Sequence, residues 1–532
     1  MGFLLQRDGW IYAAANRKSR GTFVVDINIA GWRGCFSDVD FSILEFANGP
    51  SVRCNSALLS LPEYKIEVNP YERTFNLSSL SFSMIADCLP INNFLKSGLS
   101  FSGIKVKVYW LILNNEFSLD QAFLIVDGTA TNFQYSEPDN VVNFDIVDEQ
   151  LGGDCTFPPR AITLDTFPES LGINEESYGK CYPVIIGSVK KMPVLDITDD
   201  RTRYLVLDDP HGRISGTPVS KAYDGDNEIA VGAISQAADV DALGNTYWYA
   251  DVTSDPSLSN DVTVDIDAGN AALVDAISFL LTYSEKFDVF DLNSLKKLSH
   301  ELSALTFALV FNEAVDGGVI GAIKERLIKE LPISIFQRGK KYYFQSLFWD
   351  RDIRKSLSTD TNILQTISSP TEISNEIMCN DFVVTAGISG LRGDSAAAVG
   401  RNRFNDALCA TNAMRYGSVG RKEISLPDAA DSKSATWMAN WLVETFARKR
   451  VRVSYLCTFD VLDLNPWDTI QVFDHNMGWT HGPLFKIVGM TFGSTNGIIL
   501  NLLSLDDYFD VYGINQTEDH NHFSFSLSGV TE

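Results

Sequence analysis

Residues 103–110 read Gly-Ile-Lys-Val-Lys-Val-Tyr-Trp, and this stretch decides the fold class. Small or basic residues alternate with apolar ones, and a period of two residues predicts a half-buried β-strand. Further along, 123–126 is a continuous apolar run that we expect to end at Asp127-Gly128, and 141–147 alternates again. Turn signals recur about every 10–15 residues between 21 and 150, which is typical of an antiparallel barrel or sandwich.

Helices are predicted in the middle of the chain. Asn270 is a candidate cap for a helix with apolar positions at 273–281, and Asp291 opens a second helix. A third apolar face runs over 320–331 and ends before Pro332. The next segment, 333–344, predicts a hairpin with glycine in its turn. A later stripe of apolar residues predicts one long helix, and its members are Trp437, Met438, Trp441, Leu442 and Phe446.

The sequence therefore predicts an α+β fold that is predominantly β and has several domains. At 532 residues the chain is too long for one hydrophobic core. The predicted parts are an N-terminal β-barrel-like domain (1–155), a second β domain completed by later strands (156–250), an α/β domain with the hairpin (251–360), a β-rich domain with one long helix (361–510) and a C-terminal tail (511–532).

The charge balance limits the class of partner. The chain has 68 acidic and 43 basic residues, a net charge of −25 and a pI of about 4.6. Such a surface repels phosphate backbones, which argues against tight nucleic-acid binding. Solubility is the simplest interpretation. The alternatives are a surface that nucleic acid must pass without sticking, or a face for basic partners.

The cysteines and the terminal sequence indicate a cytoplasmic folding environment. Eight cysteines are scattered without a CxxC pair, which favours buried thiols over a zinc module or a disulfide-rich secreted fold. We expect no signal peptide and no transmembrane helix, because the N-terminus lacks a cationic start before a long apolar run, and no segment has 18 apolar residues without charge.

No catalytic motif is present in the sequence, and we predict no catalytic, cofactor-binding or metal-binding residue. The nucleophile elbow, the phosphate-binding loops and the HExxH zinc motif are all missing. Tyr223–Glu228 resembles a calcium loop only superficially, and a tight turn is the better interpretation. The basic run 448–450 could bind an anion, but neutralising the end of the long helix is the simpler role.

Two pairs of histidines leave a metal site open. His475 and His481 share a loop, for which a solvated hairpin is the simpler interpretation. His520 and His522 stand two residues apart, so that on a strand they would face the same side. Three such strands around a threefold axis could surround one octahedral metal ion. A polar tail is the competing interpretation. Within that tail, 523–527 alternates and suits a strand added to a neighbour's sheet edge.

The order of elements in the carboxyl third resembles the tail-tip or baseplate hub proteins of tailed bacteriophages. The resemblance rests on a helix (435–450), a strand (451–459), the turn and strand Leu-Asn-Pro-Trp-Asp-Thr-Ile-Gln-Val (464–472), and a hairpin (485–503). Trp467 stands where that family usually has glycine. Tyr-Gly-Lys-Cys-Tyr-Pro-Val-Ile-Ile-Gly at 178–187 is similar to another stretch of the family. The middle helices with the hairpin resemble its α/β domain.

The resemblance implies a fold, an assembly and a set of partners. It implies two β-barrel-like domains, with strands from distant segments, and a smaller α/β domain. It also implies a homotrimeric ring in the virion that joins the sixfold tail tube and distal tail protein to a threefold central fibre or spike, with the tape measure protein as a further partner. Phage DNA would pass through the lumen without specific binding, and the host envelope would be met only indirectly. Assembly would take place in the bacterial cytoplasm.

Two other functions compete with this structural one. A tail-associated cell-wall-degrading enzyme would need a deep pocket with carboxylates or histidines of perturbed pKa. A virion-borne receptor- or carbohydrate-binding protein would need exposed aromatic platforms. We predict that the protein is not an enzyme.

Overall fold

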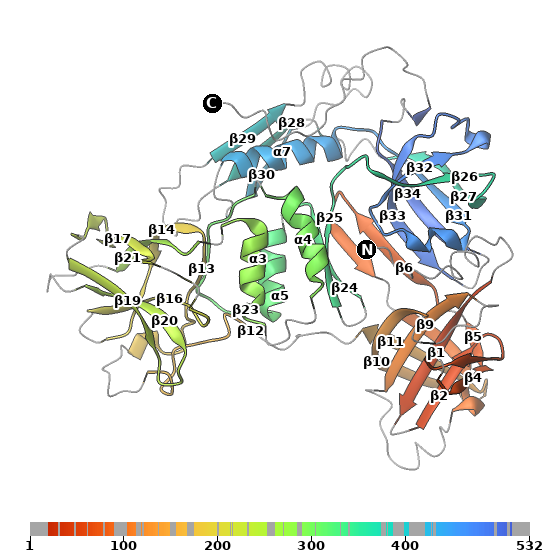
Figure 1. Cartoon of the computed structure of the whole chain (residues 1–532), viewed down its shortest axis with the longest axis horizontal. Coiled ribbons are helices and arrows are strands. Elements are labelled where there is room, and N and C mark those ends of the chain that lie inside the picture. The colour runs from red at the N-terminus through yellow and green to blue at the C-terminus, as the bar shows by residue number, and fades with distance from the viewer. Residues whose placement is uncertain are drawn as a thin grey trace.

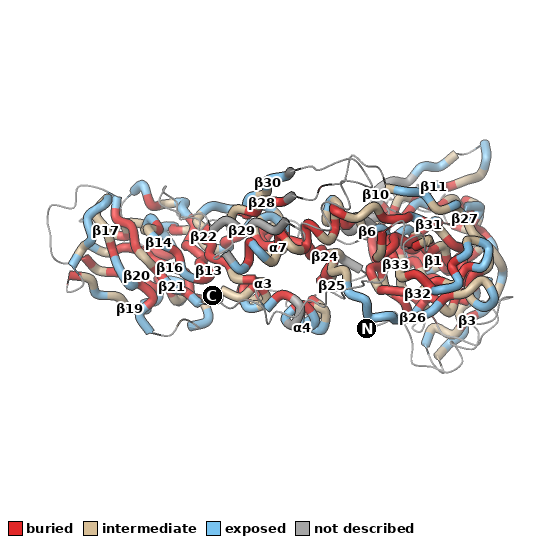
Figure 2. The backbone as a smooth tube through the Cα atoms, turned by 90° about the horizontal axis from the view of Figure 1, so that it is seen from above, coloured by how far each residue is buried: buried red, intermediate tan, exposed pale blue. Residues whose placement is uncertain are grey.

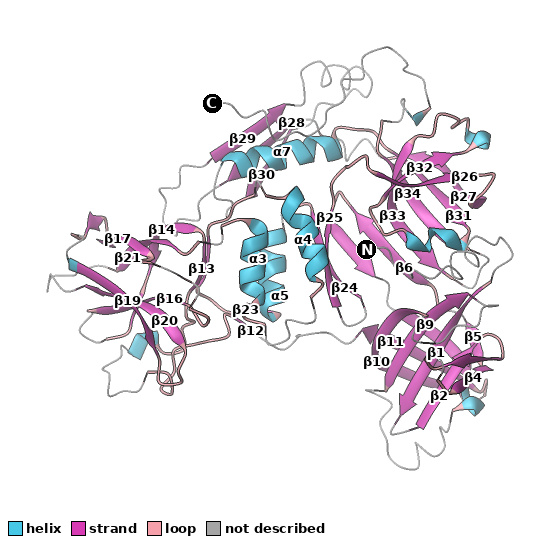
Figure 3. Ribbon diagram, viewed as in Figure 1, coloured by secondary structure: helices cyan, strands magenta, loops and turns pink. Residues whose placement is uncertain are grey.

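The protein is a flattened, elongated arrangement of β-sheets around a helical middle (Figures 1 and 2). The computed structural model describes residues 20–512 except 30–31, 47–48, 61, 78–79, 90–103, 113–118, 120–121, 137, 149–155, 168–174, 199–201, 213, 215, 231–232, 253–260, 270, 285–289, 304, 330, 339–340, 374–378, 380, 387–397, 404–420, 427, 429–431, 494–496 and 508–510. Strands far outnumber helices, which confirms the predominantly β, α+β fold (Figure 3). No helix in these described ranges is long and apolar enough to cross a membrane.

The N-terminal sheet has nine strands. Their order in space is β3 (Phe41–Leu44), β4 (Ser51–Ser56), β2 (Trp32–Ser37), β1 (Gly21–Ile29), β9 (Lys105–Ile112), β10 (Phe123–Ser136), β11 (Val141–Asp148), β8 (Leu80–Ile85) and β5 (Leu58–Ser60). The strand expected near 103–110 is β9, and its even-numbered positions are buried, as the alternation predicts. The pairing is antiparallel except that β2 and β4 run parallel.

One boundary in this sheet was predicted wrongly. Strand β10 does not end at Asp127-Gly128 but continues to Ser136. The register shifts twice along it, once against β9 and once against β11. Such bulges let a strand pass through a turn-like dipeptide while its neighbours stay paired.

The C-terminal sheet draws strands from two distant parts of the chain. Its main path is β26 (Ile353–Ser358), β32 (Thr469–Phe473), β33 (Leu484–Phe492), β34 (Ile498–Ser504), β31 (Val451–Cys457) and β27 (Ile363–Glu372). A hairpin of β6 (Tyr64–Asn69) and β7 (Thr74–Leu77) completes it, with β6 antiparallel to β33. A segment from the first hundred residues is thus part of a sheet made almost entirely after residue 350.

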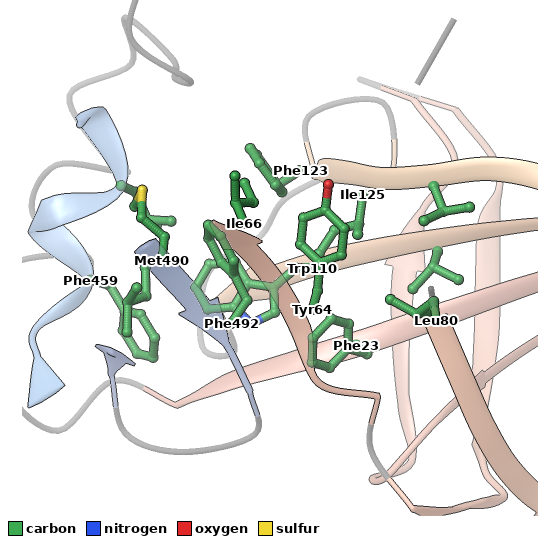
Figure 4. Close-up of a cluster of buried hydrophobic side chains, with 14 of the residues drawn as sticks. Phe23, Tyr64, Ile66, Leu80, Trp110, Phe123, Ile125, Phe459, Met490 and Phe492 are labelled. Carbon is green, nitrogen blue, oxygen red and sulfur yellow. The ribbon is translucent and has the colours of Figure 1, made fainter. Parts of the chain in front are cut away.

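One hydrophobic cluster, here called the shared core, fills the space between these two sheets (Figure 4). Trp110 of β9 is fully buried and packs 5.0 Å from Phe459 and 6.1 Å from Phe492, centroid to centroid. Phe492 also lies 5.5 Å from Phe123 and 6.0 Å from Tyr64. Aromatic side chains bury the most area per residue, so this contact holds the two sheets together.

The middle of the molecule is helical, as predicted. Helices α3 (Leu273–Leu281), α4 (Leu292–Glu301), α5 (Gly318–Ala322) with a π-turn (Ile323–Ile328), and α7 (Ser432–Phe446) share one hydrophobic core with the predicted hairpin of β24 (Ile333–Arg338) and β25 (Lys341–Ser346). Asp291 caps α4 by accepting from the Asn293 amide. The Asn270 cap is wrong, because α3 starts after Ala272, which makes no side-chain cap. Short pairs and a three-stranded sheet complete the middle: β12 (Thr156–Phe157) with β23 (Val315–Asp316), β13 (Val184–Ile186) with β22 (Leu309–Phe311), and β28 (Asp381–Ala386), β29 (Ala398–Arg403), β30 (Arg421–Leu426).

Residues 188–267 form two four-stranded sheets, here called the side lobe. One sheet contains β14 (Ser188–Pro193), β21 (Val262–Asp267), β17 (Val219–Asp224) and β18 (Asn227–Glu228). The other contains β15 (Leu195–Asp196), β16 (Arg203–Asp208), β20 (Thr246–Val252) and β19 (Ile234–Val240). Side chains of β13 and β22 contribute to both the lobe core and the middle core, which joins the two parts. The division of the chain into the five predicted domains stays a prediction.

Candidate functional sites and docking surfaces

The histidine pairs do not assemble a metal site within the described part of the chain. His475 starts a short 3-10 turn between β32 and β33, and its Nε2 lies 3.4 Å from an exposed carboxylate oxygen of Asp360. No group of three or more His, Cys, Asp or Glu in the described ranges could hold a metal ion. His520, His522 and the alternating stretch 523–527 lie outside the described residues.

The loop that resembles a calcium site is a hairpin turn. Tyr223 faces Glu228 and Asp224 faces Asn227 across β17 and β18. Asp226 at the turn is almost fully exposed, and it pairs with Lys191 at 3.1 Å. The tight turn preferred from the sequence is confirmed.

The basic run after α7 has a structural role that explains its position. Arg450 is completely buried, and its guanidinium lies 3.4 Å from the centre of the Trp349 ring. It donates to the carbonyl of Glu444 at 2.7 Å, in the last turn of α7, and to the carbonyl of Ser504 at 2.9 Å. Burial lowers the pKa of Arg450 to about 10. Because these contacts occupy the guanidinium with carbonyls and an aromatic face, helix-end neutralisation is confirmed for this residue.

A second buried cation lies on the same side of the C-terminal sheet and was missed by the sequence analysis. The Lys486 ammonium in β33 donates to the Asp350 carboxylate at 2.9 Å and to the Trp467 carbonyl at 3.1 Å. Burial lowers the pKa of Lys486, while Asp350 acts in the opposite direction. Trp467 has a positive φ of 73°, and glycine is the residue that usually takes this conformation. Its indole lies 4.8 Å from that of Trp349, so the two buried cations belong to one junction between α7 and the sheet.

Among the described carboxyl groups, that of Asp208 in the side lobe has the most strongly raised pKa. The Asp208 side chain has no exposed surface, and burial raises its pKa to about 7. Arg160 lies 3.2 Å away and acts in the opposite direction, while Asp209 and Asp241 add to the increase. Neither Asp208 oxygen accepts a hydrogen bond from a described residue.

A cavity of about 380 Å³ lies elsewhere, on the N-terminal sheet. Its lining is Trp32, Arg33, Gly34, Cys35, Phe36, Val52, Arg53, Asn55 and Cys88. The cavity has no carboxylate in its lining. The carboxyl group of Asp208, whose pKa is raised, has no exposed surface and does not line this cavity. An acid–base enzyme needs both features at one place, and in the described ranges these two features are separate.

Exposed strand edges are the other candidate surfaces. Strand β19 lies at the edge of its sheet in the side lobe, where Val240 is 57% exposed. Leu243 in the adjoining turn is 64% exposed. Strand β26 lies at an edge of the C-terminal sheet, where Ile353 is 48% exposed. A sheet edge offers unpaired backbone groups, and exposed aliphatic side chains on it favour pairing with another chain.

Together the described elements define a multi-sheet α+β protein with exposed strand edges. Searches against protein-family models and curated sequences give no match. Among solved structures, the chain is similar to a tail protein from Neisseria meningitidis MC58 (TM-score 0.38, 9% identity, 91% of this chain and 96% of that chain). It is also similar to a 43 kDa tail protein of prophage MuSo2 from Shewanella oneidensis (TM-score 0.36, 8% identity, 91% of this chain and 98% of that chain). A third similar structure is a prophage tail protein from Listeria monocytogenes EGD-e (TM-score 0.37, 7% identity, 87% of this chain and 94% of that chain). At these TM-scores and identities the likeness does not establish a shared function.

Proposed function

We propose that this chain is a structural hub protein in the tail tip or baseplate of a tailed bacteriophage. In this role a homotrimeric ring joins the sixfold tail tube and distal tail protein to a threefold central fibre or spike, and frames the DNA exit channel. The tape measure protein is a further partner, and the host envelope is contacted only indirectly. The protein would act in the virion after assembly in the bacterial cytoplasm.

The observation that carries this proposal is the β6–β7 hairpin inside the C-terminal sheet. The resemblance in the sequence implies barrel-like domains that take strands from distant segments. Here β6 supplies Tyr64 and Ile66 to positions opposite Phe492 and Met490 of β33. The helix α7, strand β31, the turn at Trp467 and strands β32–β34 also follow one another in the order that the resemblance requires.

The edge strands suggest how copies of the chain meet. The side lobe, residues 188–267, has fifteen acidic and six basic residues, and Asp239 lies on its edge strand β19. The opposite end of the molecule has Arg354 exposed on edge strand β26, beside Ile353. Opposite charge and two exposed aliphatic edges support contact between β19 of one copy and β26 of the next. A head-to-tail contact of this kind closes into a ring when the rotation fits.

The acidic balance supports the channel role. Three copies of a chain with net charge −25 carry −75. Acidic groups that face a lumen repel DNA phosphates, so DNA could slide without binding. A charge map of the assembled ring that showed a neutral or basic channel wall would contradict this part of the proposal.

Mass photometry of the purified full-length chain tests the ring. We expect trimers, and we expect Arg354→Glu to shift the population toward monomers, because it places an acidic group opposite the acidic lobe. Arg53→Glu changes the charge of an exposed arginine on another sheet in the same way and should leave the trimer intact. A wild-type chain that is monomeric at micromolar concentration, in the presence of its tail-tube partner as well, would overturn the proposal.

A second candidate function is a virion-borne carbohydrate binder, and the cavity on the N-terminal sheet favours it. Trp32, Arg53 and Asn55 combine an aromatic wall with polar groups, the mixture that sugar sites use. Saturation-transfer NMR with acidic and neutral cell-wall sugars tests it. Binding that is lost in Trp32→Ala would support this function, and no transfer with either class of sugar would exclude it for those ligands.

A further inference from the structure

Two cysteines of the N-terminal sheet face each other across parallel strands. Cys35 of β2 is the register partner of Cys54 of β4. Cys35 is 2% exposed and Cys54 is fully buried, and both belong to the same small hydrophobic cluster on one face of the sheet. Neighbouring strands lie about 4.8 Å apart, and disulfides form between Cα atoms about 4.4–6.8 Å apart. The pair therefore needs little backbone movement to become a disulfide.

The other described cysteines do not share this arrangement. Cys181, Cys379 and Cys457 are buried, and Cys88 is partly exposed, and no strand pairing in the described ranges places any of them opposite another cysteine. The hydrogen bond between the two thiols, followed by burial, raises the pKa of Cys35. The Cys35 thiol is therefore protonated and slow to react at neutral pH.

Only one cysteine of the pair belongs to the lining of a cavity. Cys35 is part of the lining of the cavity of about 380 Å³ on the N-terminal sheet. The cavity is large enough for the end of a small thiol compound, but the buried Cys54 is not part of its lining. Attack on such an oxidant would thus begin at Cys35, and Cys54 would complete the exchange.

We propose that Cys35 and Cys54 are a modification site, reduced while the protein folds in a reducing compartment and joined as a disulfide after it leaves. In the first step the Cys35 sulfur attacks a small disulfide such as oxidised glutathione, and one glutathione thiol leaves. The Cys54 sulfur then attacks the mixed disulfide at Cys35, and the second glutathione leaves. Two S–H bonds are lost, one protein S–S bond forms, and the glutathione disulfide takes up the two electrons and two protons.

The new bond would close the loop between residues 35 and 54, which contains edge strand β3. Closing a loop restricts the unfolded chain, so the edge formed by β3 and β4 becomes harder to open. This inference does not depend on the proposed hub role, because the pair lies within one chain.

Peptide mapping by mass spectrometry tests the inference directly. The full-length chain is purified under reducing conditions, incubated with oxidised glutathione at pH 8, alkylated and digested. We expect a peptide cross-linked through Cys35 and Cys54, lighter than the two reduced peptides by two hydrogen atoms, while Cys181 and Cys457 stay alkylatable. Free thiols at both positions, a stable mixed disulfide with glutathione, or linkage to another cysteine would each overturn the proposal.

Hydrogen exchange gives a second readout. Oxidation should slow exchange in peptides that cover β3 and β4, and the slowing should disappear in Cys54→Ala. Because that variant could fold poorly, the comparison of oxidised and re-reduced wild-type protein is decisive by itself. Equal exchange before and after formation of the bond would show that it does not hold this edge.

Discussion

The shared core and the side lobe differ in what they bury. In the shared core, Trp110, Phe123 and Phe492 join two sheets through apolar contacts. The side lobe has smaller hydrophobic clusters and buries the carboxyl groups of Asp208 and Asp209, and Arg160 lies 3.2 Å from Asp208. Apolar burial contributes to stability at any pH, whereas a buried carboxyl group links stability to pH. The two ends of one chain should therefore respond differently to the same perturbation.

The largest effect is expected from Trp110→Ala. The indole is fully buried at the contact between the sheets, so its removal leaves a large cavity and should cost about 3–5 kcal/mol. Because a chain with several cores need not unfold in one step, hydrogen exchange of peptides from β9 and β33 is the suitable measurement. Both peptides should lose protection, while peptides of the side lobe should not.

Leu59→Ala is the matched control, because Leu59 is 55% exposed on edge strand β5 of the same sheet. We expect a change within about 0.5 kcal/mol. Equal losses of exchange protection in Trp110→Ala and Leu59→Ala, or a loss of protection that extends to the side lobe, would contradict the view of the shared core as a separate stability unit.

The second effect concerns the pH dependence of the side lobe. The folded-state pKa of Asp208 is about 7, above the ordinary value of 3.8. The folded lobe therefore holds this proton more tightly than the unfolded chain, and the resulting stability is lost as pH rises toward and through 7. Between pH 5 and pH 8 the opening free energy of β16 and β20 should fall by roughly 2–3 kcal/mol.

Hydrogen exchange corrected for the intrinsic pH dependence measures this slope. In Asp208→Asn the slope should vanish, whatever the variant does to absolute stability. Asp226→Asn, at a nearly fully exposed site in the same lobe, should retain it. A slope that persists in Asp208→Asn would assign the titration to another group.

Local sequence predicted those elements whose signals lie within a few residues. The alternation at 103–110 located β9, the aspartate at 291 capped α4, and the glycine between 333 and 344 marked the hairpin. The same reasoning failed where pairing overrides a local signal, as at Asp127-Gly128 in β10.

Long-range partners explain the remaining differences. The β6–β7 hairpin reads as part of the N-terminal sheet, because nothing in its own residues identifies β33 as its neighbour. Lys486 reads as a polar position of a strand, and its burial depends on Asp350, far away in the sequence, and on the Trp467 carbonyl. Asp208 depends on Arg160 in the same way. Polar groups in the interior are thus the features of this chain that sequence patterns predict least well.

The smallest effect comes from two matched tyrosines. Tyr455, in strand β31 of the C-terminal sheet, donates to Asp474 at 2.7 Å, and Tyr182, which precedes the side lobe in the chain, donates to Asp241 of that lobe at 2.9 Å. After Tyr182→Phe, the same Asp241 oxygen still accepts from Asn245 at 2.9 Å. Asp474 is fully buried, and its hydrogen bonds from the Asn476 and Met477 amides go to Oδ1. Tyr455→Phe therefore leaves Oδ2 of Asp474 without the hydrogen bond from the tyrosine.

Leaving a buried acceptor unsatisfied costs about 1–3 kcal/mol, whereas losing one of two bonds to the same oxygen costs about 0.5–1.5 kcal/mol. Tyr455→Phe should therefore destabilise its surroundings more than Tyr182→Phe, as measured by exchange in β31 and in β20. The opposite order would mean that the side lobe depends more on its polar interior than the shared core does. In that case, buried hydrogen bonds would matter to the stability of the lobe as well as the buried carboxyl group of Asp208.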